Sequence, residues 1–334
     1  MTAAAADRPA AIDRFLDRAG WGGAARRPLA GDASFRRYLR LERDGARAVL
    51  MDAPPPMEDV RPFVRIAAML RDLDLSAPAV LAADTDHGLL LLEDLGDDTY
   101  TRVIGAGGDE TALYGVAVDL LADLQARVAP AVLDDLPAYD LARMLDEATV
   151  MVDWFLPSVT GAPAEPGLRA DYLARWHDVL AAAPLGPPTL VLRDYHVDNL
   201  MWLGDRQGIA ACGLLDFQDA VAGPRAYDLV SLLEDARRDV APTLAAAMRT
   251  RYLERARVDD PAAFGHAYAV LGAQRNCRIV GVFARLDRRD GKPHYLRHLP
   301  RVWRLIAEDL RHPALGPIRE WLDRHVPPSA RGIA

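Results

Sequence analysis

The spacing of apolar residues changes near Gly96, and this change constrains the fold more than any other feature of the sequence. Before Gly96, short apolar runs alternate with turn residues, as in antiparallel strands. They form a hairpin pattern around Asp44-Gly45 and two further expected strands over 78–83 and 88–92. After Gly96, apolar residues recur at helical spacing. The expected helices, two early ones included, cover 11–19, 58–73, 110–127, 139–156, 168–182, 225–238, 241–256, 261–286, 299–311 and 316–325.

A strand-rich first third followed by a helix-rich remainder predicts an α+β fold. The chain has 334 residues, of which 51% are hydrophobic and 26% charged, so it can bury a substantial core as one large domain or two lobes. Its formal net charge of -8 argues against general binding to nucleic acids or membrane surfaces, because both need a positive field. The two cysteines, Cys212 and Cys277, provide neither a disulfide framework nor a four-ligand zinc site.

The N-terminal segment and the length of the apolar runs predict a cytoplasmic protein. The alanine-rich N-terminus carries Asp7, Arg8 and Asp13 where a signal peptide needs an unbroken apolar region. No apolar run approaches the roughly 20 residues that are needed to span a bilayer.

A polar loop between short apolar runs is the candidate site. Residues 190–192 are apolar, the loop that follows holds Asp194, His196 and Asn199, and a later apolar run ends on Asp216. Phosphoryl transfer needs a carboxylate that orients the attacking hydroxyl and oxygen ligands that hold magnesium on the phosphates. Asp194 suits the first role, and Asn199 and Asp216 suit the second. The alternative is an ordinary acidic loop, because the spacing D-x4-N is common by chance.

The spacing D-x4-N followed by a strand and D-F resembles the catalytic and metal-binding loops of the protein-kinase-like superfamily. The variant D-x-H-x-x-N over 194–199 resembles the aminoglycoside phosphotransferase and choline kinase branch. The resemblance implies a two-lobed fold that uses ATP and Mg2+, with a nucleotide-binding lobe over 1–95, a hinge at 93–96 and a helical lobe over 96–334. It also implies that His196 braces the loop and that the main chain near Glu93 and Leu95 binds adenine.

The phosphate-binding part of the resemblance is incomplete. Residues 30–35 stand where the fold places its phosphate-covering loop, so Ser34 and Arg36 or Arg37 are candidate phosphate contacts. A plain turn with solvated arginines is the alternative. The superfamily usually has a lysine where this chain has Met51. Either an arginine at 36, 37 or 40 supplies the charge, or nucleotide binding is lost and the chain is an inactive kinase-like binding module.

Longer segments resemble the bacterial anomeric kinases of N-acetylmuramic acid and N-acetylglucosamine, which serve cell-wall recycling. They run from about residue 32 to residue 296 and include DASFRRYLRL, VLMDAPPP, LLLLEDLGDDTY and QRNCRIVGVFARLDRRDGKPHYL. The resemblance accounts for Met51 and implies ATP-dependent phosphorylation of the 1-hydroxyl of an amino sugar. It does not select the sugar.

The resemblance places the substrate walls on the helices over 139–156 and 261–286, where Glu147 and Arg275 are the candidate contacts. The alternative for Arg275 is a solvated helix residue. Asp219 is either a third contact or a turn residue. Asp228 resembles the aspartate that braces the catalytic loop, or else it is an acid at a helix N-terminus, where the macrodipole favours it.

The main rival enzyme is an aminoglycoside phosphotransferase or another kinase of small-molecule hydroxyls. A polycationic antibiotic needs an acidic basin, to which Asp140, Asp146, Glu147 and Asp153 could contribute. At about 100° per residue, position 153 falls on a different helix face from positions 140 and 147, which weakens that basin.

Overall fold

The computed structural model describes residues 8–29 and 35–331, and it has the α+β architecture that the sequence predicts. By its internal contacts the chain divides into two compact units. Unit 1 comprises residues 1–120 and 197–219, and unit 2 comprises 121–196 and 220–334. The lobe boundary at 93–96 stays a prediction, because these contacts group the chain differently.

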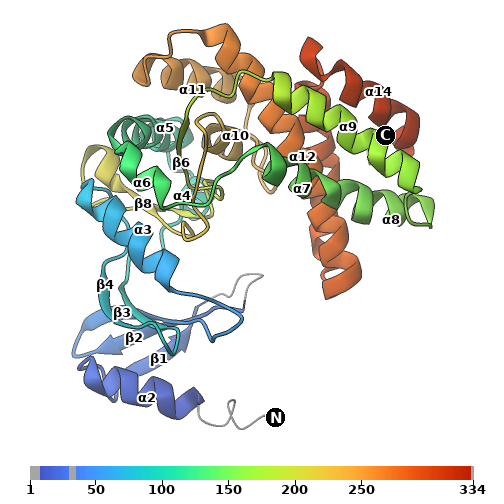
Figure 1. Ribbon diagram of the computed structural model, residues 1–334. Helices are drawn as coiled ribbons and strands as arrows, with labels where there is room; N and C mark the ends of the chain where they lie inside the picture. The colour runs from blue at the N-terminus through green and yellow to red at the C-terminus, as the bar shows by residue number, and fades with distance from the viewer. Residues whose placement is uncertain (1–7, 30–34, 332–334) are drawn as a thin grey trace. The chain divides into compact units, whose positions relative to one another are not determined.

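Unit 1 contains a five-stranded antiparallel sheet with the strand order β1-β2-β3-β5-β4 (Figure 1). The hairpin of β2 and β3 turns at Asp44 and Gly45, whose φ angles of 51° and 80° suit a two-residue hairpin turn. The hairpin and the two later strands are therefore confirmed. The bounds are β1 Ala25–Pro28, β2 Arg37–Arg43, β3 Ala46–Asp52, β4 Val80–Asp84 and β5 Leu89–Glu93.

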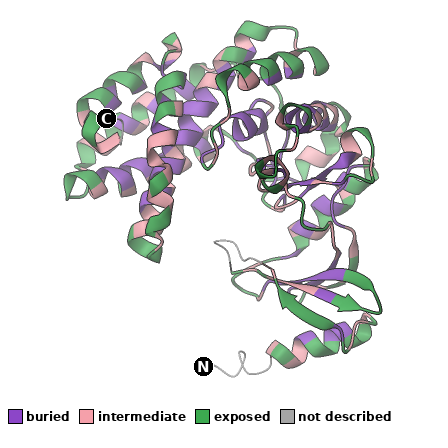
Figure 2. Cartoon of the chain, turned by 180° about the vertical axis from the view of Figure 1, so that it is seen from behind, coloured by how far each residue is buried: buried purple, intermediate pink, exposed green. Residues whose placement is uncertain are grey.

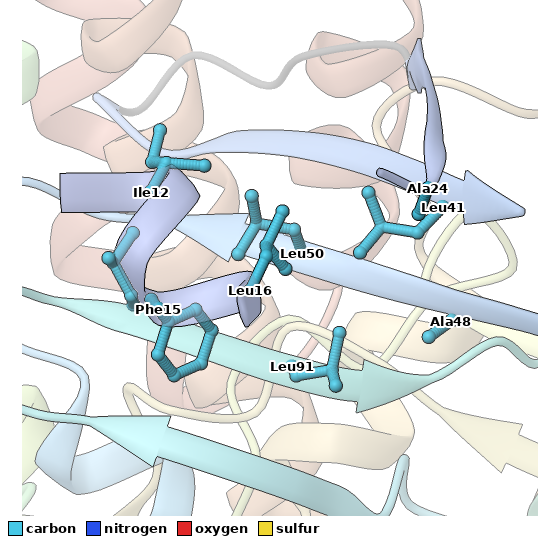
Figure 3. Close-up of a cluster of buried hydrophobic side chains, with 9 residues drawn as sticks. Ile12, Phe15, Leu16, Ala24, Leu41, Ala48, Leu50 and Leu91 are labelled. Atoms are coloured by element: carbon cyan, nitrogen blue, oxygen red, sulfur yellow. The ribbon is translucent and has the colours of Figure 1, made fainter. Parts of the chain in front are cut away.

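Helix α2 (Arg8–Arg18) covers one face of this sheet (Figure 3). Its apolar side chains Ile12, Phe15 and Leu16 point toward Leu41 and Leu50 of the hairpin. Alternate residues of a strand share a face, so the cluster takes every second position of β2, β3 and β5. Tyr38, Arg40, Val49, Met51 and Leu90 therefore belong to the opposite face.

Helix α3 (Arg61–Asp72) joins the sheet region of unit 1 to the segment that holds Asn199 and Asp216. Pro62 lies in its first turn, where a missing amide hydrogen costs nothing. Its buried Phe63 stacks on Phe217, with ring centroids 4.8 Å apart. The segment itself forms a small antiparallel pair, β7 (Leu200–Trp202) and β8 (Cys212–Leu214).

Unit 2 is mostly helical, with one antiparallel strand pair, β6 (Pro188–Val191) and β9 (Val221–Pro224). Helices α4 (Tyr100–Gly105) and α5 (Glu110–Arg127) precede it in the chain, and α5 continues from unit 1 into unit 2. The remaining helices are α6 Pro130–Asp134, α7 Leu141–Val150, α8 Leu156–Thr160, α9 Pro166–Ala182, α10 Tyr227–Leu233, α11 Pro242–Arg255, α12 Pro261–Asp290, α13 Leu299–Asp309 and α14 Gly316–His325.

The long helix α12 is the centre of unit 2, and most of its middle turns are buried (Figure 2). It begins at Asp260, whose side chain accepts a hydrogen bond from the amide of Ala263, and it ends at Gly291 in the left-handed conformation. Gly281 allows α12 to lie against the π-helical turn Met151–Phe155, because a Cβ at this position would come within 2.4 Å of the Val150 carbonyl oxygen.

The described part of the chain contains no helix with both the length and the apolar character that a membrane span requires.

Candidate active site

The two expected metal ligands lie side by side in unit 1. Asn199 comes directly before β7, and Asp216 follows β8 by two residues. Because β7 and β8 are paired, the Leu215 amide donates to the Asn199 carbonyl oxygen at 3.0 Å, and Asn199 Nδ2 lies 3.5 Å from Asp216 Oδ2. Asp216 has a φ of 57°, a conformation that is costly for a residue with a side chain and common at functional sites.

The chemistry of these side chains fits magnesium, which prefers oxygen ligands and binds proteins through one or two carboxylates together with water and phosphate oxygens. An amide oxygen of Asn199 and the carboxylate of Asp216 are such donors. Over residues 8–29 and 35–331, no group of three histidine, cysteine or acidic side chains could hold a metal ion alone.

Asp219 is connected to this pair through a glutamine. Gln218 Nε2 donates to Asp216 Oδ1 at 2.8 Å and to Asp219 Oδ2 at 3.1 Å, and Asp219 is exposed. The expected substrate role of Asp219 stays a prediction.

Arg36 brings a positive charge to Asp216. Its Nη2 lies 3.3 Å from Asp216 Oδ1, and its Nε lies 3.8 Å from Glu58 Oε2. Burial opposes the charge on Arg36, but Tyr38, Asp216 and Glu58 outweigh it and raise the pKa of Arg36. Ser34, the neighbouring candidate, lies outside the described residues.

The expected hinge is held by ion pairs within unit 1. Glu93 accepts hydrogen bonds from Arg71, Arg206 and the amide of Ala79. Its side chain is therefore occupied, and the binding of an adenine by main-chain groups near Glu93 and Leu95 stays a prediction. Leu95 lies over Gly213, where an added Cβ would be 3.2 Å from Leu95 Cδ1.

The loop that carries Asp194 belongs to unit 2, where a buried carboxylate holds it in place. Asp228, at the start of α10, accepts hydrogen bonds from the amides of Leu192 at 2.6 Å and Arg193 at 2.9 Å. Burial raises the pKa of Asp228 to about 7, against the opposing effect of these two hydrogen bonds. The predicted bracing role of Asp228 is confirmed. Arg193 has a φ of 70°, so the backbone is strained immediately before Asp194.

Glu147 braces the same loop from a second side. Its carboxylate accepts hydrogen bonds from Arg193 and from the Tyr139 hydroxyl, and Arg278 Nε lies 3.2 Å away. Only 13% of the Glu147 side chain is exposed. These partners are all protein groups, and the substrate contact that the sequence suggested for Glu147 stays a prediction.

Arg275 differs from its expected role. It is 5% exposed, and it donates to the Ser231 hydroxyl at 2.8 Å and toward the Glu234 carbonyl oxygen. A side chain fixed inside the helical core does not agree with a substrate contact. Arg278, one turn further along α12, was missed by sequence reasoning; burial opposes its charge, but Tyr227, Glu147, Tyr139 and Asp194 outweigh burial and raise the pKa of Arg278. The available signal was its spacing of three residues from Arg275, which places the two side chains near one another on the helix.

His196 is buried, with 6% of its surface exposed, and its Nε2 lies 3.5 Å from Arg237 Nη1. The His196 amide donates to the Asp194 carbonyl oxygen at 3.2 Å. Its role in bracing the loop stays a prediction.

Comparison with known proteins gives consistent results. A model of the "Phosphotransferase enzyme family" matches residues 25–266. An N-acetylmuramate/N-acetylglucosamine kinase of Caulobacter vibrioides is 39% identical over 97% of this chain and 98% of its own length. The kinase of the same name from Pseudomonas aeruginosa is 38% identical, over 88% of this chain and 87% of its own.

Among solved structures, the GDP complex of aminoglycoside 2′-phosphotransferase-IIIa aligns with a TM-score of 0.63. The alignment covers 91% of this chain and 98% of that one at 15% identity. This similarity shows the fold alone, a kinase-like α+β fold.

Proposed function

Because this chain belongs to the phosphotransferase enzyme family, we propose that it transfers the γ-phosphoryl group of ATP to the anomeric 1-hydroxyl of N-acetylmuramic acid and N-acetylglucosamine. The observation that carries this proposal is the similarity to two kinases of these sugars along nearly the whole chain. Both candidate groups of the site, the loop at Asp194 and the pair Asn199 and Asp216, fall inside the matched region.

Asp194 is proposed to orient the 1-hydroxyl and to accept its proton. An anomeric hydroxyl is somewhat more acidic than an ordinary alcohol, so this proton transfer is less demanding. The hydrogen bonds from Leu192 and Arg193 to Asp228, and the ion pair of Arg193 with Glu147, fix the main chain next to Asp194. A carboxylate positioned in this way reduces the entropy that is lost when the hydroxyl is aligned for attack.

Asn199 and Asp216 are proposed to hold Mg2+, which when bound supplies positive charge to the phosphate oxygens. The two side chains follow Asp194 in the chain by five and 22 residues. The pairing of β7 and β8 places them side by side, so a single ion could take an oxygen from each. Main-chain groups near Glu93 and Leu95 are proposed to bind the adenine.

The geometry of unit 2 argues against an aminoglycoside as the acceptor. Of the four acids that could form a basin for a polycation, Glu147 is paired with Arg193, and Asp153 with Arg169 at 2.8 Å. Asp140 caps α7 by accepting from the Arg143 amide at 2.9 Å. Three of the four carboxylates therefore already have protein partners.

A substrate panel tests the proposal. Release of ADP from ATP would be measured with N-acetylmuramic acid, N-acetylglucosamine, kanamycin and choline. The proposal predicts turnover with the two amino sugars and none with the other two compounds. Turnover only with kanamycin would instead assign an antibiotic-modifying activity, and no turnover with any compound would favour the inactive binding module.

A further inference from the structure

The missing lysine at Met51 leaves open which cation meets the nucleotide phosphates, and the strand register of unit 1 separates the three candidates. Tyr38 pairs with Met51, and Arg40 pairs with Val49. Directly opposed residues of an antiparallel pair lie on the same face of the sheet. Residues of β2 an even number of positions from Tyr38, such as Arg40, therefore share the face of Met51, which is the face away from α2.

Arg37 is on the other face. It pairs in register with Asp52, and its Nη2 lies 2.8 Å from Asp52 Oδ2. Arg8 of α2 binds the same carboxylate, with Nε 2.9 Å from Oδ1. Arg37 thus belongs to the surface that α2 covers and is not on the side of Met51.

Arg40 is on the correct face but is already engaged by the hinge region. Its Nε lies 2.7 Å from Asp94 Oδ2, its Nη1 lies 2.7 Å from Asp97 Oδ1, and its Nη2 donates to the Gly96 carbonyl oxygen at 2.9 Å. Two carboxylates and a carbonyl hold the guanidinium in place, so it is a structural cation of residues 94–97.

Arg36 remains, and its partners distinguish it from the other two. It lies two residues before Tyr38, its side chain is 11% exposed, and it contacts Asp216 and Glu58. Glu58 is itself oriented, because its Oε1 accepts a hydrogen bond from the Phe35 amide at 3.1 Å. Asp216 is the carboxylate proposed above as a metal ligand.

We propose that Arg36, oriented by Glu58, is the cation that binds the nucleotide phosphates in this chain, and that its ion pair with Asp216 makes metal binding depend on the nucleotide. The inference rests on the proposed function. A guanidinium and a divalent ion repel each other when they share one carboxylate. A polyphosphate removes this conflict, because it supplies negative charge to both cations and draws the guanidinium from Asp216.

The proposal predicts effects of opposite sign from one substitution. Arg36→Gln should weaken ADP binding by about 10- to 100-fold, the range expected for losing a charge-assisted hydrogen bond. The same variant should bind Mn2+ without nucleotide more tightly than the original protein, by about 10-fold, because a competing cation has been removed. ADP binding would be measured by calorimetry and Mn2+ binding by electron paramagnetic resonance, both without sugar.

Three further variants make the test specific. Arg43→Gln removes the same charge from the exposed end of β2 and should change neither affinity. Arg36→Lys keeps the charge and should retain most of the ADP binding. Glu58→Gln leaves the guanidinium in place but removes the group that orients it, so ADP binding should weaken by several fold. Circular dichroism of each variant shows that it is folded.

Unchanged ADP binding in both Arg36→Gln and Glu58→Gln would overturn the proposal, as would weaker ADP binding in Arg37→Gln than in Arg36→Gln. If Arg36→Gln weakens Mn2+ binding, the proposed competition between Arg36 and the metal ion for Asp216 is wrong. None of these results affects the proposed function, which fails separately if the original protein binds no nucleotide or phosphorylates neither sugar.

Discussion

At the scale of single residues, the candidate site depends on groups that fix the main chain around Asp194. Asp228 accepts hydrogen bonds from the consecutive amides of Leu192 and Arg193, and Glu147 holds the side chain of Arg193. The loop is thus positioned from α10 on one side and from α7 on the other.

Substitution of Asp194 tests its assigned role. Asp194→Asn keeps the size of the side chain and removes the carboxylate, so turnover should fall by at least about 100-fold because the proton acceptor is lost. ADP affinity should change by less than about threefold. The two readouts are the rate of ADP release with saturating sugar and calorimetric ADP binding. Turnover close to that of the original protein would remove Asp194 from the mechanism.

A buried acid pair makes a prediction about stability and pH. Burial and the neighbouring Glu234 raise the pKa of Asp309 well above its ordinary value, and burial raises that of Glu234. The folded protein keeps a proton that the unfolded chain releases near pH 4, so the free energy of unfolding falls as pH rises above 4. In the Asp309→Asn variant the side chain at this position cannot ionise. Its amide group can donate the hydrogen bond to Glu234 that the protonated carboxyl of Asp309 donates in the original protein.

The advantage of Asp309→Asn over the original protein should therefore grow with pH. Across the window that begins near pH 4 and ends at the raised pKa, the slope approaches about 1.4 kcal/mol per pH unit for one group. Urea unfolding at pH 5, 6.5 and 8 measures it. Equal differences between the two proteins at all three values would contradict the assigned pKa shift.

At the scale of secondary-structure elements, the crossing of α12 and the π-helical turn Met151–Phe155 depends on one position. Gly281→Ala would place a methyl group 2.4 Å from the Val150 carbonyl oxygen, so we expect a loss of about 3 kcal/mol or more in the free energy of unfolding. Gly265 is in the same helix, and no atom lies within 4 Å of an added Cβ there.

Gly265→Ala is therefore the matched control, and it should raise the free energy of unfolding by up to about 1 kcal/mol, because alanine favours helices over glycine. Chemical denaturation of both variants tests the contrast. Similar stabilities of the two variants would mean that α12 does not approach Val150 as closely as described.

The elements also show what could be predicted from sequence. Helices such as α12 and the hairpin of β2 and β3 follow from local periodicity and from the Asp44-Gly45 turn. Strand β1 was missed because ARRP has no apolar alternation and is exposed along its length. The expected helix over 139–156 starts two residues later and is interrupted by the π-helical turn, against which α12 packs at Gly281.

The site was less predictable than the fold. Asp194, Asn199 and Asp216 stand in a recognisable spacing, and Asp228 could be found by the same resemblance. The bond between Arg193 and Glu147 joins residues 46 positions apart and has no signature in either local sequence. The choice between Arg36 and Arg37 depends on the face of the sheet to which each side chain belongs and on the ion pair that each one forms. The strand register and the side-chain contacts of the structure reveal both, and the sequence does not.

At the scale of the whole molecule, the chain passes from unit 1 to unit 2 between residues 120 and 121 and returns for residues 197–219. The proposed proton acceptor therefore belongs to one unit and the proposed metal ligands to the other. Phe217 stacks on Phe63 next to Asp216, which attaches the segment that carries Asp216 to unit 1. Asp194 is attached equally firmly to unit 2 through Asp228.

The central claim is that the anomeric hydroxyl receives the phosphoryl group. It is tested most directly by incubating the protein with ATP, Mg2+ and either N-acetylglucosamine or its 1-deoxy analogue, and by locating the phosphate in the product by phosphorus-31 NMR. The account predicts a sugar 1-phosphate that has lost its reducing end, with no product from the 1-deoxy analogue. A phosphate on any other hydroxyl, or equal turnover of the analogue, would contradict it.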